Sequence, residues 1–177
     1  NFIGGLDDIR VHQRALSETE IRALIDNADY AIWDSGAADS KSTSPENWLT
    51  DQVPTASTNV VVNSSSDTIL WEGPYQLNSL ALHRNFDGTL ELQSPLTLDD
   101  AFIINMLTPS QPYAKLKLVI NDDTPGSFGA INAPNITVSG ELIVEKNTPY
   151  TLGTVQLFSG PVNGFFSSIS LPTPPAG

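Results

Sequence analysis

The chain has 177 residues and a mass of 19.0 kDa, which suffices for one complete hydrophobic core or for one domain with a fragment of another. Eight basic and 20 acidic residues give a formal net charge of -12, and such a surface repels nucleic-acid phosphates and anionic lipid headgroups. The absence of cysteine excludes a disulfide framework, a zinc–thiolate site and a cysteine nucleophile. We therefore expect an extracellular or cell-surface protein with no nucleic-acid partner and no membrane insertion.

Residues 1–28 are expected to form a strand followed directly by a helix. The strand covers Phe2 to Val11 and carries two glycines at a bend before its apolar positions. Ser17 is the expected N-cap, and Glu20 three residues later completes a capping box. Apolar residues at helical spacing continue to about Asn27. The sequence predicts no other helix.

Residues 29–58 are expected to form an ordered polar loop, because serine, aspartate, asparagine and threonine dominate this segment. Two tryptophans, Trp33 and Trp48, are expected to anchor it. Together with Trp71 and Tyr75 they are candidates for a carbohydrate-binding platform, since aromatic faces stack on the apolar faces of sugars. The alternative is that Trp33 and Trp48 cover the end of a repeat core, with their N–H groups bonded to the backbone.

Residues 59–177 are predicted to form an all-β domain. Apolar residues alternate with polar or small ones in eight short runs: VVVN, TILW, SLALH, GTLELQ, LTLDDAFII, AKLKLVI, ITVSGELIVE and TVQLF. Strand, corner and strand recur, with Gly88 and Gly140 marking corners that require a residue tolerant of positive φ. Both a β-solenoid and a β-sandwich fit this pattern, and the solenoid is the preferred interpretation.

Two stretches resemble known families. FIGGLDDIRVHQRALSETEI resembles the closing strand and following helix of a laminin-G-like (concanavalin A-like) jelly roll, which implies that residues 1–28 are the end of such a domain. The opening IWDSGAADSKSTSPENWLTDQVPTASTNVVV, the repeated strands and the closing LFSGPVNGFFSSISLPTPPAG resemble autotransporter-passenger-like repeat segments of bacterial surface proteins. The resemblance implies a secreted structural or adhesive protein.

Metal-binding and catalytic candidates are few. The jelly-roll resemblance implies a calcium ligand at Asp7, with the alternative that this carboxylate bonds backbone N–H groups at the nearby bend. The adjacent pairs Asp99–Asp100 and Asp122–Asp123 are better explained as solvated strand and turn residues than as a glycosidase pair. His12 and His83 stand in no recognisable nucleophile context. We therefore expect no enzymatic activity and no cofactor other than a calcium ion.

The two ends of the chain favour a role in assembly. The first strand lacks its sheet and the closing motif lacks a final strand, so we expect either a fragment of a longer protein or a subunit that pairs its β-edges with neighbours. The predicted function is a non-enzymatic extracellular structural or adhesive module, such as a subunit of a fibre, whose partners are other copies or other domains of the same polypeptide. The alternative function is a carbohydrate-binding module that recognises a glycan through Trp48 and Trp33.

Overall fold

A computed structural model describes the chain from Tyr30 onward with gaps. The described residues are Ala15, 30–37, 39–63, 67–73, 75–83, 85–104, 114–122, Thr124, 127–147 and 154–172. The predicted jelly-roll strand and the predicted helix lie outside them, so both stay predictions.

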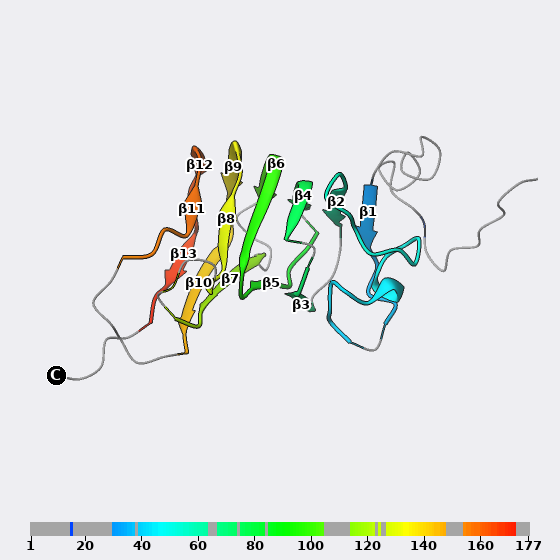
Figure 1. Cartoon of the computed structure of the whole chain (residues 1–177), viewed down its shortest axis with the longest axis horizontal. Helices are drawn as coiled ribbons and strands as arrows, with labels where there is room; N and C mark the ends of the chain where they lie inside the picture. The colour runs from blue at the N-terminus through cyan, green and yellow to red at the C-terminus, as the bar shows by residue number, and fades with distance from the viewer. Residues whose placement is uncertain are drawn as a thin grey trace, which may run out of the picture.

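Thirteen strands and one short 3-10 helix make up the described structure (Figure 1). The 3-10 helix η1 covers Pro45–Asn47. The strands are β1 (Tyr30–Trp33), β2 (Asn59–Val62), β3 (Thr68–Trp71), β4 (Gln76–Leu82), β5 (Thr89–Leu92), β6 (Pro95–Ile104), β7 (Lys115–Ile120), β8 (Ala130–Asn132), β9 (Asn135–Val138), β10 (Glu141–Lys146), β11 (Phe158–Ser159), β12 (Val162–Gly164) and β13 (Ser168–Ser170).

The strands form two sheets, and every pair of named strands runs parallel. The first sheet has the order β1-β2-β4-β6-β8-β11, with β9 beside β6 and β12 beside β9. The second sheet has the order β13-β10-β7-β5-β3. From β2 onward the chain passes back and forth between the sheets, with β8 and β9, and later β11 and β12, following each other in the first sheet. The strands lie side by side along the long axis of the molecule (Figure 1). We call this arrangement the stack.

Register aligns apolar side chains of successive strands in columns that run along the stack. In the first sheet one column consists of Ala31, Val60, Leu80, Phe102, Ile136 and Val162. In the second sheet one column consists of Ile69, Leu90, Leu116, Leu142 and Ile169. Buried members of both sheets form one hydrophobic cluster, so the alternation of apolar residues in each strand supplies a continuous core between the sheets.

A glycine marks one corner where the chain crosses from the first sheet to the second. Gly140 has a φ of +75°, and a Cβ placed on it would lie 2.3 Å from the backbone oxygen of Ala114 in the preceding layer. Only glycine fits there, because a side chain would clash and the left-handed conformation costs other residues energy. The predicted corner at Gly140 is therefore confirmed. Gly88 is not among the glycines with positive φ, so the same explanation is wrong for Gly88.

The prediction of an all-β fold is confirmed for the described residues. Seven of the eight predicted runs coincide with strands, whereas the run TVQLF contributes only its last residue, Phe158, to β11. The structure adds strands that the sequence did not predict, namely β1, β8, β12 and β13. Of these, β1 lies inside the segment 29–58 assigned to a loop and pairs with β2. The sheet therefore begins earlier than residue 59.

Candidate functional site

The two ends of the stack differ, and the first is closed by the loop of residues 34–49. This loop forms backbone hydrogen bonds with the outer edges of both sheets. At the edge of β1, Leu49 donates its N–H to the carbonyl of Ile32 over 2.9 Å. At the edge of β3, Leu70 donates to the carbonyl of Ser40 over 2.8 Å, and Ser42 donates to the carbonyl of Leu70 over 3.0 Å. Edge strands attract unwanted pairing, so this loop protects the edges. We call this end the closed end.

Three tryptophans fill the core at the closed end. Trp48 is 0% exposed and contacts Trp33 edge-on, with ring centroids 5.2 Å apart. It contacts Trp71 in the same way at 6.1 Å. Edge-to-face packing is a favoured arrangement of aromatic pairs, so the three rings make a rigid plug. The indole N–H of Trp48 donates to the carbonyl of Ser42 over 2.9 Å, whereas the buried N–H of Trp33 has no partner among the described residues.

A polar network holds the closing loop in shape around Asn47, whose side chain is buried. Its amide donates to the Asp39 carboxylate and to the Lys41 carbonyl, both over 3.0 Å, and its amide oxygen accepts from the N–H of Ala37. A hydrogen bond from the hydroxyl of Ser44, followed by one from the backbone N–H of Lys41, lowers the pKa of Asp39 below its ordinary value. The carboxylate thus stays ionised where the loop uses it as an acceptor.

These positions argue against Trp33 and Trp48 as a carbohydrate-binding platform. Both indoles are buried, 1% and 0% exposed, so neither offers a face on which a sugar could stack. Their burial matches the alternative interpretation, in which they cover the end of the core. The backbone partner expected for each indole N–H is present for Trp48 and missing for Trp33.

The opposite end of the stack is open. It consists of β11, β12 and β13, and within the described residues each of these strands is paired on one side only. The core columns stop here in exposed side chains. Leu142 is 6% exposed, whereas Ile169, the next member of its column, is 58% exposed. Val162 is 46% exposed, although Ile136 before it in its column is fully buried. We call this end the open end.

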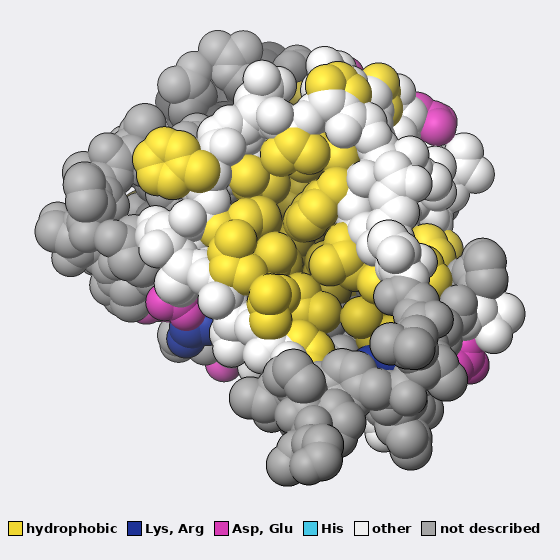
Figure 2. All heavy atoms as spheres, turned by 90° about the vertical axis from the view of Figure 1, so that its left-hand side faces the viewer, with side chains coloured by type: hydrophobic (Ala, Val, Ile, Leu, Met, Phe, Trp, Pro, Cys, Tyr) yellow, Lys and Arg dark blue, Asp and Glu magenta, His cyan; other side chains and the backbone are white. Residues whose placement is uncertain are grey.

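Figure 2 looks onto the open end and shows apolar side chains gathered in its middle, with polar and backbone atoms around them. Phe165 and Leu171 add to the exposed apolar surface, and Phe158 and Phe166 pack partly against the core. Single exposed apolar residues are ordinary on protein surfaces, but a contiguous patch signals an interaction site. Val162 and Ile169 continue buried columns, so this part of the patch is the cross-section of the core itself.

The chain at the open end is also free of charge. All 8 basic and 20 acidic residues of the sequence lie at or before Lys146, so residues 147–177 carry no charged side chain. Natural proteins protect exposed β-edges with charged residues such as lysine. The cores of protein interfaces, in contrast, are depleted in charge. The open end thus has the composition of an interface.

Elsewhere in the stack, charged side chains lie on the outer face. Lys117 forms ion pairs with Glu145 at 2.8 Å and with Glu91 at 3.1 Å across neighbouring strands of the second sheet. The hydrogen bond from Lys117 to Glu145, followed by that to Glu91, raises the pKa of the lysine. This ladder joins β5, β7 and β10 and does not extend to β13.

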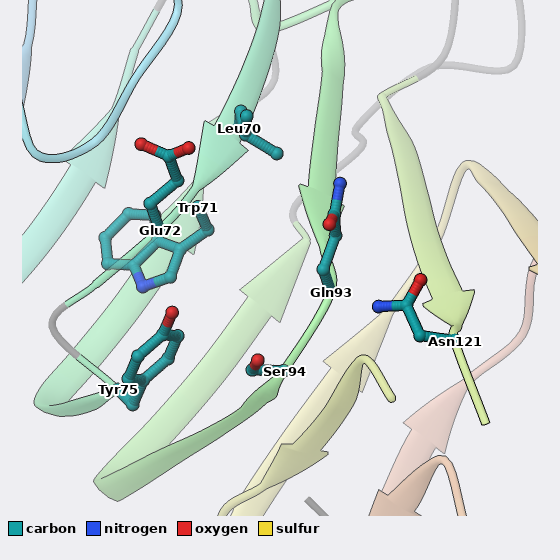
Figure 3. Close-up of a pocket in the computed structure, with 7 residues that line it drawn as sticks. All are labelled: Leu70, Trp71, Glu72, Tyr75, Gln93, Ser94 and Asn121. Atoms are coloured by element: carbon teal, nitrogen blue, oxygen red, sulfur yellow. The ribbon is translucent and has the colours of Figure 1, made fainter. Parts of the chain in front are cut away.

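A groove of about 290 Å³ lies beside the second sheet (Figure 3). Its lining residues come from β3, from the connections after β3 and β5, and from the end of β7; they are Leu70, Trp71, Glu72, Tyr75, Gln93, Ser94 and Asn121. Tyr75 is 48% exposed. Glu72 turns away from Tyr75 in Figure 3, and its carboxylate pairs with Lys41 at 3.2 Å. The groove therefore offers one aromatic ring with hydroxyl and amide groups. Of the four predicted platform aromatics, only Tyr75 is exposed.

The remaining predicted site residues do not come together. Asp7 and His12 lie outside the described residues. Asp99 and Asp100 are both exposed at an irregularity in the pairing of β4 with β6, which agrees with their interpretation as solvated residues. Asp122 is an exposed turn residue that accepts a hydrogen bond from Ser127, which lowers its pKa. Among the described residues no three His, Asp or Glu side chains lie close enough to hold a metal ion.

The described part of the chain contains no helix long and apolar enough to cross a bilayer. No family model, no curated protein and no solved structure matches the chain. Both resemblances proposed from the sequence therefore stay predictions, and the function has to be inferred from the two ends of the stack and from the groove.

The sequence analysis expected an unsatisfied β-edge after the closing motif, but it did not identify the exposed apolar surface of the open end. Two signals for it were present: the run without charge after Lys146, and the apolar residues that keep alternating through LFSGPVNGFFSSISL. Only the exposure of Val162 and Ile169, together with the pairing of β12 and β13 with one described neighbour each, reveals them as a surface.

Proposed function

We propose that the chain is a non-enzymatic structural or adhesive module of an extracellular surface protein, and that it is completed at its open end by a further layer of β-strands. The single observation that carries this proposal is the continuation of buried core columns into the exposed Ile169 and Val162. An apolar cross-section with unpaired strands on its rim fits another β layer, which would cover the core and bond the edges together.

We also infer that the module is a β-solenoid. Parallel pairing throughout both sheets and the alternation of the chain between them support this inference, because parallel neighbours need a crossover connection rather than a hairpin. A solenoid suits a structural role, since each layer contacts only its neighbours and the ends must be capped or joined. One end of this stack has a cap built from its own chain.

The proposal is tested by comparing two glutamate substitutions in one column. Ile169→Glu places a charge at the open end, and Leu142→Glu places it one layer deeper. We expect Ile169→Glu to leave the thermal unfolding of the dilute protein nearly unchanged, because the side chain is 58% exposed. Leu142→Glu is expected to abolish folding, because its charge has no partner in the core.

The same variants decide the outcome. If Ile169→Glu also prevents folding, the open end is covered within a single molecule, and the proposal fails. If Ile169→Glu folds and binds less of a dye that fluoresces on apolar surface than the unmodified chain does, the open end is an accessible surface as proposed.

The groove favours carbohydrate binding as a second candidate function. Tyr75 could stack on a sugar ring while the side chains of Ser94, Gln93 and Asn121 bond its hydroxyls. Pairing of Glu72 with Lys41 favours neutral sugars. Binding of neutral hexasaccharides of glucose or xylose by the unmodified chain, lost in Tyr75→Ala and retained in Trp48→Phe, would support this function. No binding of any of them at millimolar concentration would exclude it.

A further inference from the structure

We infer that the partner at the open end is a second copy of the chain, joined open end to open end about a twofold axis. This inference rests on the proposed function and names the source of the completing β layer. The described part of each copy offers one apolar surface without charged side chains, the open end, where strands of both sheets are unpaired on one side. A twofold axis brings two such surfaces together.

The closed end cannot supply the complementary surface. Its sheet edges at β1 and β3 are already bonded to the loop of residues 34–49, and its core is plugged by Trp48. A head-to-tail fibre needs two different surfaces that fit each other. Within the described residues the closed end carries no exposed cross-section of the core, so a fibre in which the closed end of one copy stacks on the open end of the next is disfavoured.

Charge points to the same geometry. Copies with a net charge of -12 repel one another over most of their surfaces. The open ends can approach without bringing charged side chains into contact, because the chain is uncharged from Asn147 onward. Charged residues lie instead in the layers behind, as in the ladder of Glu91, Lys117 and Glu145. An open-end contact is therefore the one that meets least repulsion.

The strands at the open end can satisfy their hydrogen bonds in this arrangement. In Figure 1 the strands run across the long axis of the stack. A twofold axis perpendicular to both the stack and the strands sets each terminal strand antiparallel to its own copy. Two antiparallel edge strands can pair through the ordinary ladder of backbone hydrogen bonds. Val162 and Ile169 of the two copies would then close one continuous core across the interface.

The absence of cysteine makes the geometry directly testable, because a single introduced cysteine can be labelled without interference. Asn163→Cys carries a dye at the exposed outer side of β12, and Thr50→Cys carries one at the exposed surface of the closed end. Donor- and acceptor-labelled samples of the full chain are mixed, and energy transfer is measured against protein concentration together with sedimentation velocity.

We expect a monomer–dimer equilibrium, with strong transfer between Asn163→Cys labels and little between Thr50→Cys labels. Ile169→Glu should weaken the dimer about 100-fold or more, because the twofold axis brings two like charges into an apolar contact. Tyr75→Glu is the matched control, since it places the same charge at an exposed aromatic residue in the groove and should leave the equilibrium unchanged.

Three results would overturn the inference: a monomer at every concentration, strong transfer between Thr50→Cys labels, or transfer between one Asn163→Cys copy and one Thr50→Cys copy. If the chain stays monomeric while Ile169→Glu leaves its stability unchanged, the second copy is excluded as the partner, and the proposed function survives with another β layer at the open end. If Ile169→Glu fails to fold, both the proposed function and the dimer are refuted.

Discussion

Replacement of Trp48 by alanine tests whether the closed end is a structural cap. The side chain is fully buried, packs edge-on against Trp33 and Trp71, and donates its N–H to the carbonyl of Ser42. Removal of a buried tryptophan side chain costs about 3–5 kcal/mol, and the larger values occur where the cavity cannot collapse. Two rigid indoles line this cavity, so we expect Trp48→Ala to lower the free energy of unfolding by about 4 kcal/mol.

The expected loss of free energy is large enough to be measured by thermal and by chemical unfolding. For a domain of this length, about 1 kcal/mol corresponds to a change in melting temperature of roughly 2–4 °C, so Trp48→Ala should lower it by about 8–16 °C. Urea denaturation followed by far-ultraviolet circular dichroism measures the free energy of unfolding. Trp48→Phe keeps an aromatic ring and leaves the Ser42 carbonyl without its donor, which costs about 1–3 kcal/mol. We expect the free energy of unfolding of Trp48→Phe to lie between that of the unmodified chain and that of Trp48→Ala.

A loss below about 1 kcal/mol for Trp48→Ala would refute this reasoning, because a buried plug cannot be removed so cheaply. That result together with lost glycan binding would restore the sugar-stacking interpretation of Trp48. A tryptophan that serves as an open sugar platform contributes to binding and little to stability.

The remaining predictions concern the core, a corner and the closing loop. Leu142→Ala should lower the free energy of unfolding by about 3 kcal/mol, whereas Ile169→Ala should lower it by less than about 1 kcal/mol in dilute solution, because only the first is buried; equal losses in urea titrations would contradict an open end. Gly140→Ala should lower the free energy of unfolding by about 2 kcal/mol or more in the same assay, because the Cβ of the alanine would lie 2.3 Å from a backbone oxygen. An unchanged free energy of unfolding would contradict the corner geometry. The hydrogen bond from Ser44 lowers the pKa of Asp39 below 3.8, so the ionised carboxylate stabilises the fold above that pH, and this stabilisation is lost as the pH falls through the lowered pKa. Tryptophan fluorescence followed against pH should therefore show a loss of stability at acidic pH that is smaller in Asp39→Asn. An identical acid transition in both proteins would assign it to other groups.

Local pattern in the sequence determined most of the strands. Runs such as TILW and AKLKLVI alternate apolar and polar residues, and the structure places them as β3 and β7. The sequence did not predict β1, because YAIW is four residues long and directly precedes a polar loop. It did not predict β12 and β13 either, because Asn163-Gly164 is typical of a turn and the SIS run carries a single apolar residue.

The candidate sites were harder to predict, because they depend on contacts between distant parts of the chain. Burial of Trp48 requires Trp71, which comes from the next sheet, and exposure of Ile169 requires that nothing pairs with the outer edge of β13. The groove joins Tyr75 to Asn121, although the four strands β4, β5, β6 and β7 lie between them in the sequence. Alternation predicts which side of a strand faces the core, but it does not predict where the stack stops.

Hydrogen exchange at the two ends of the stack, measured in dilute and in concentrated solutions of the full chain, tests the central claim most directly. We predict that the amides of β12 and β13 exchange rapidly in dilute solution and become protected as the concentration rises. The amides of β1 and β3 should exchange at the same rate in both, because the loop of residues 34–49 already bonds their edges. Unchanged exchange at β12 and β13, or protection gained at β1 and β3 instead, would contradict the assignment of the open end as the surface through which the chain assembles.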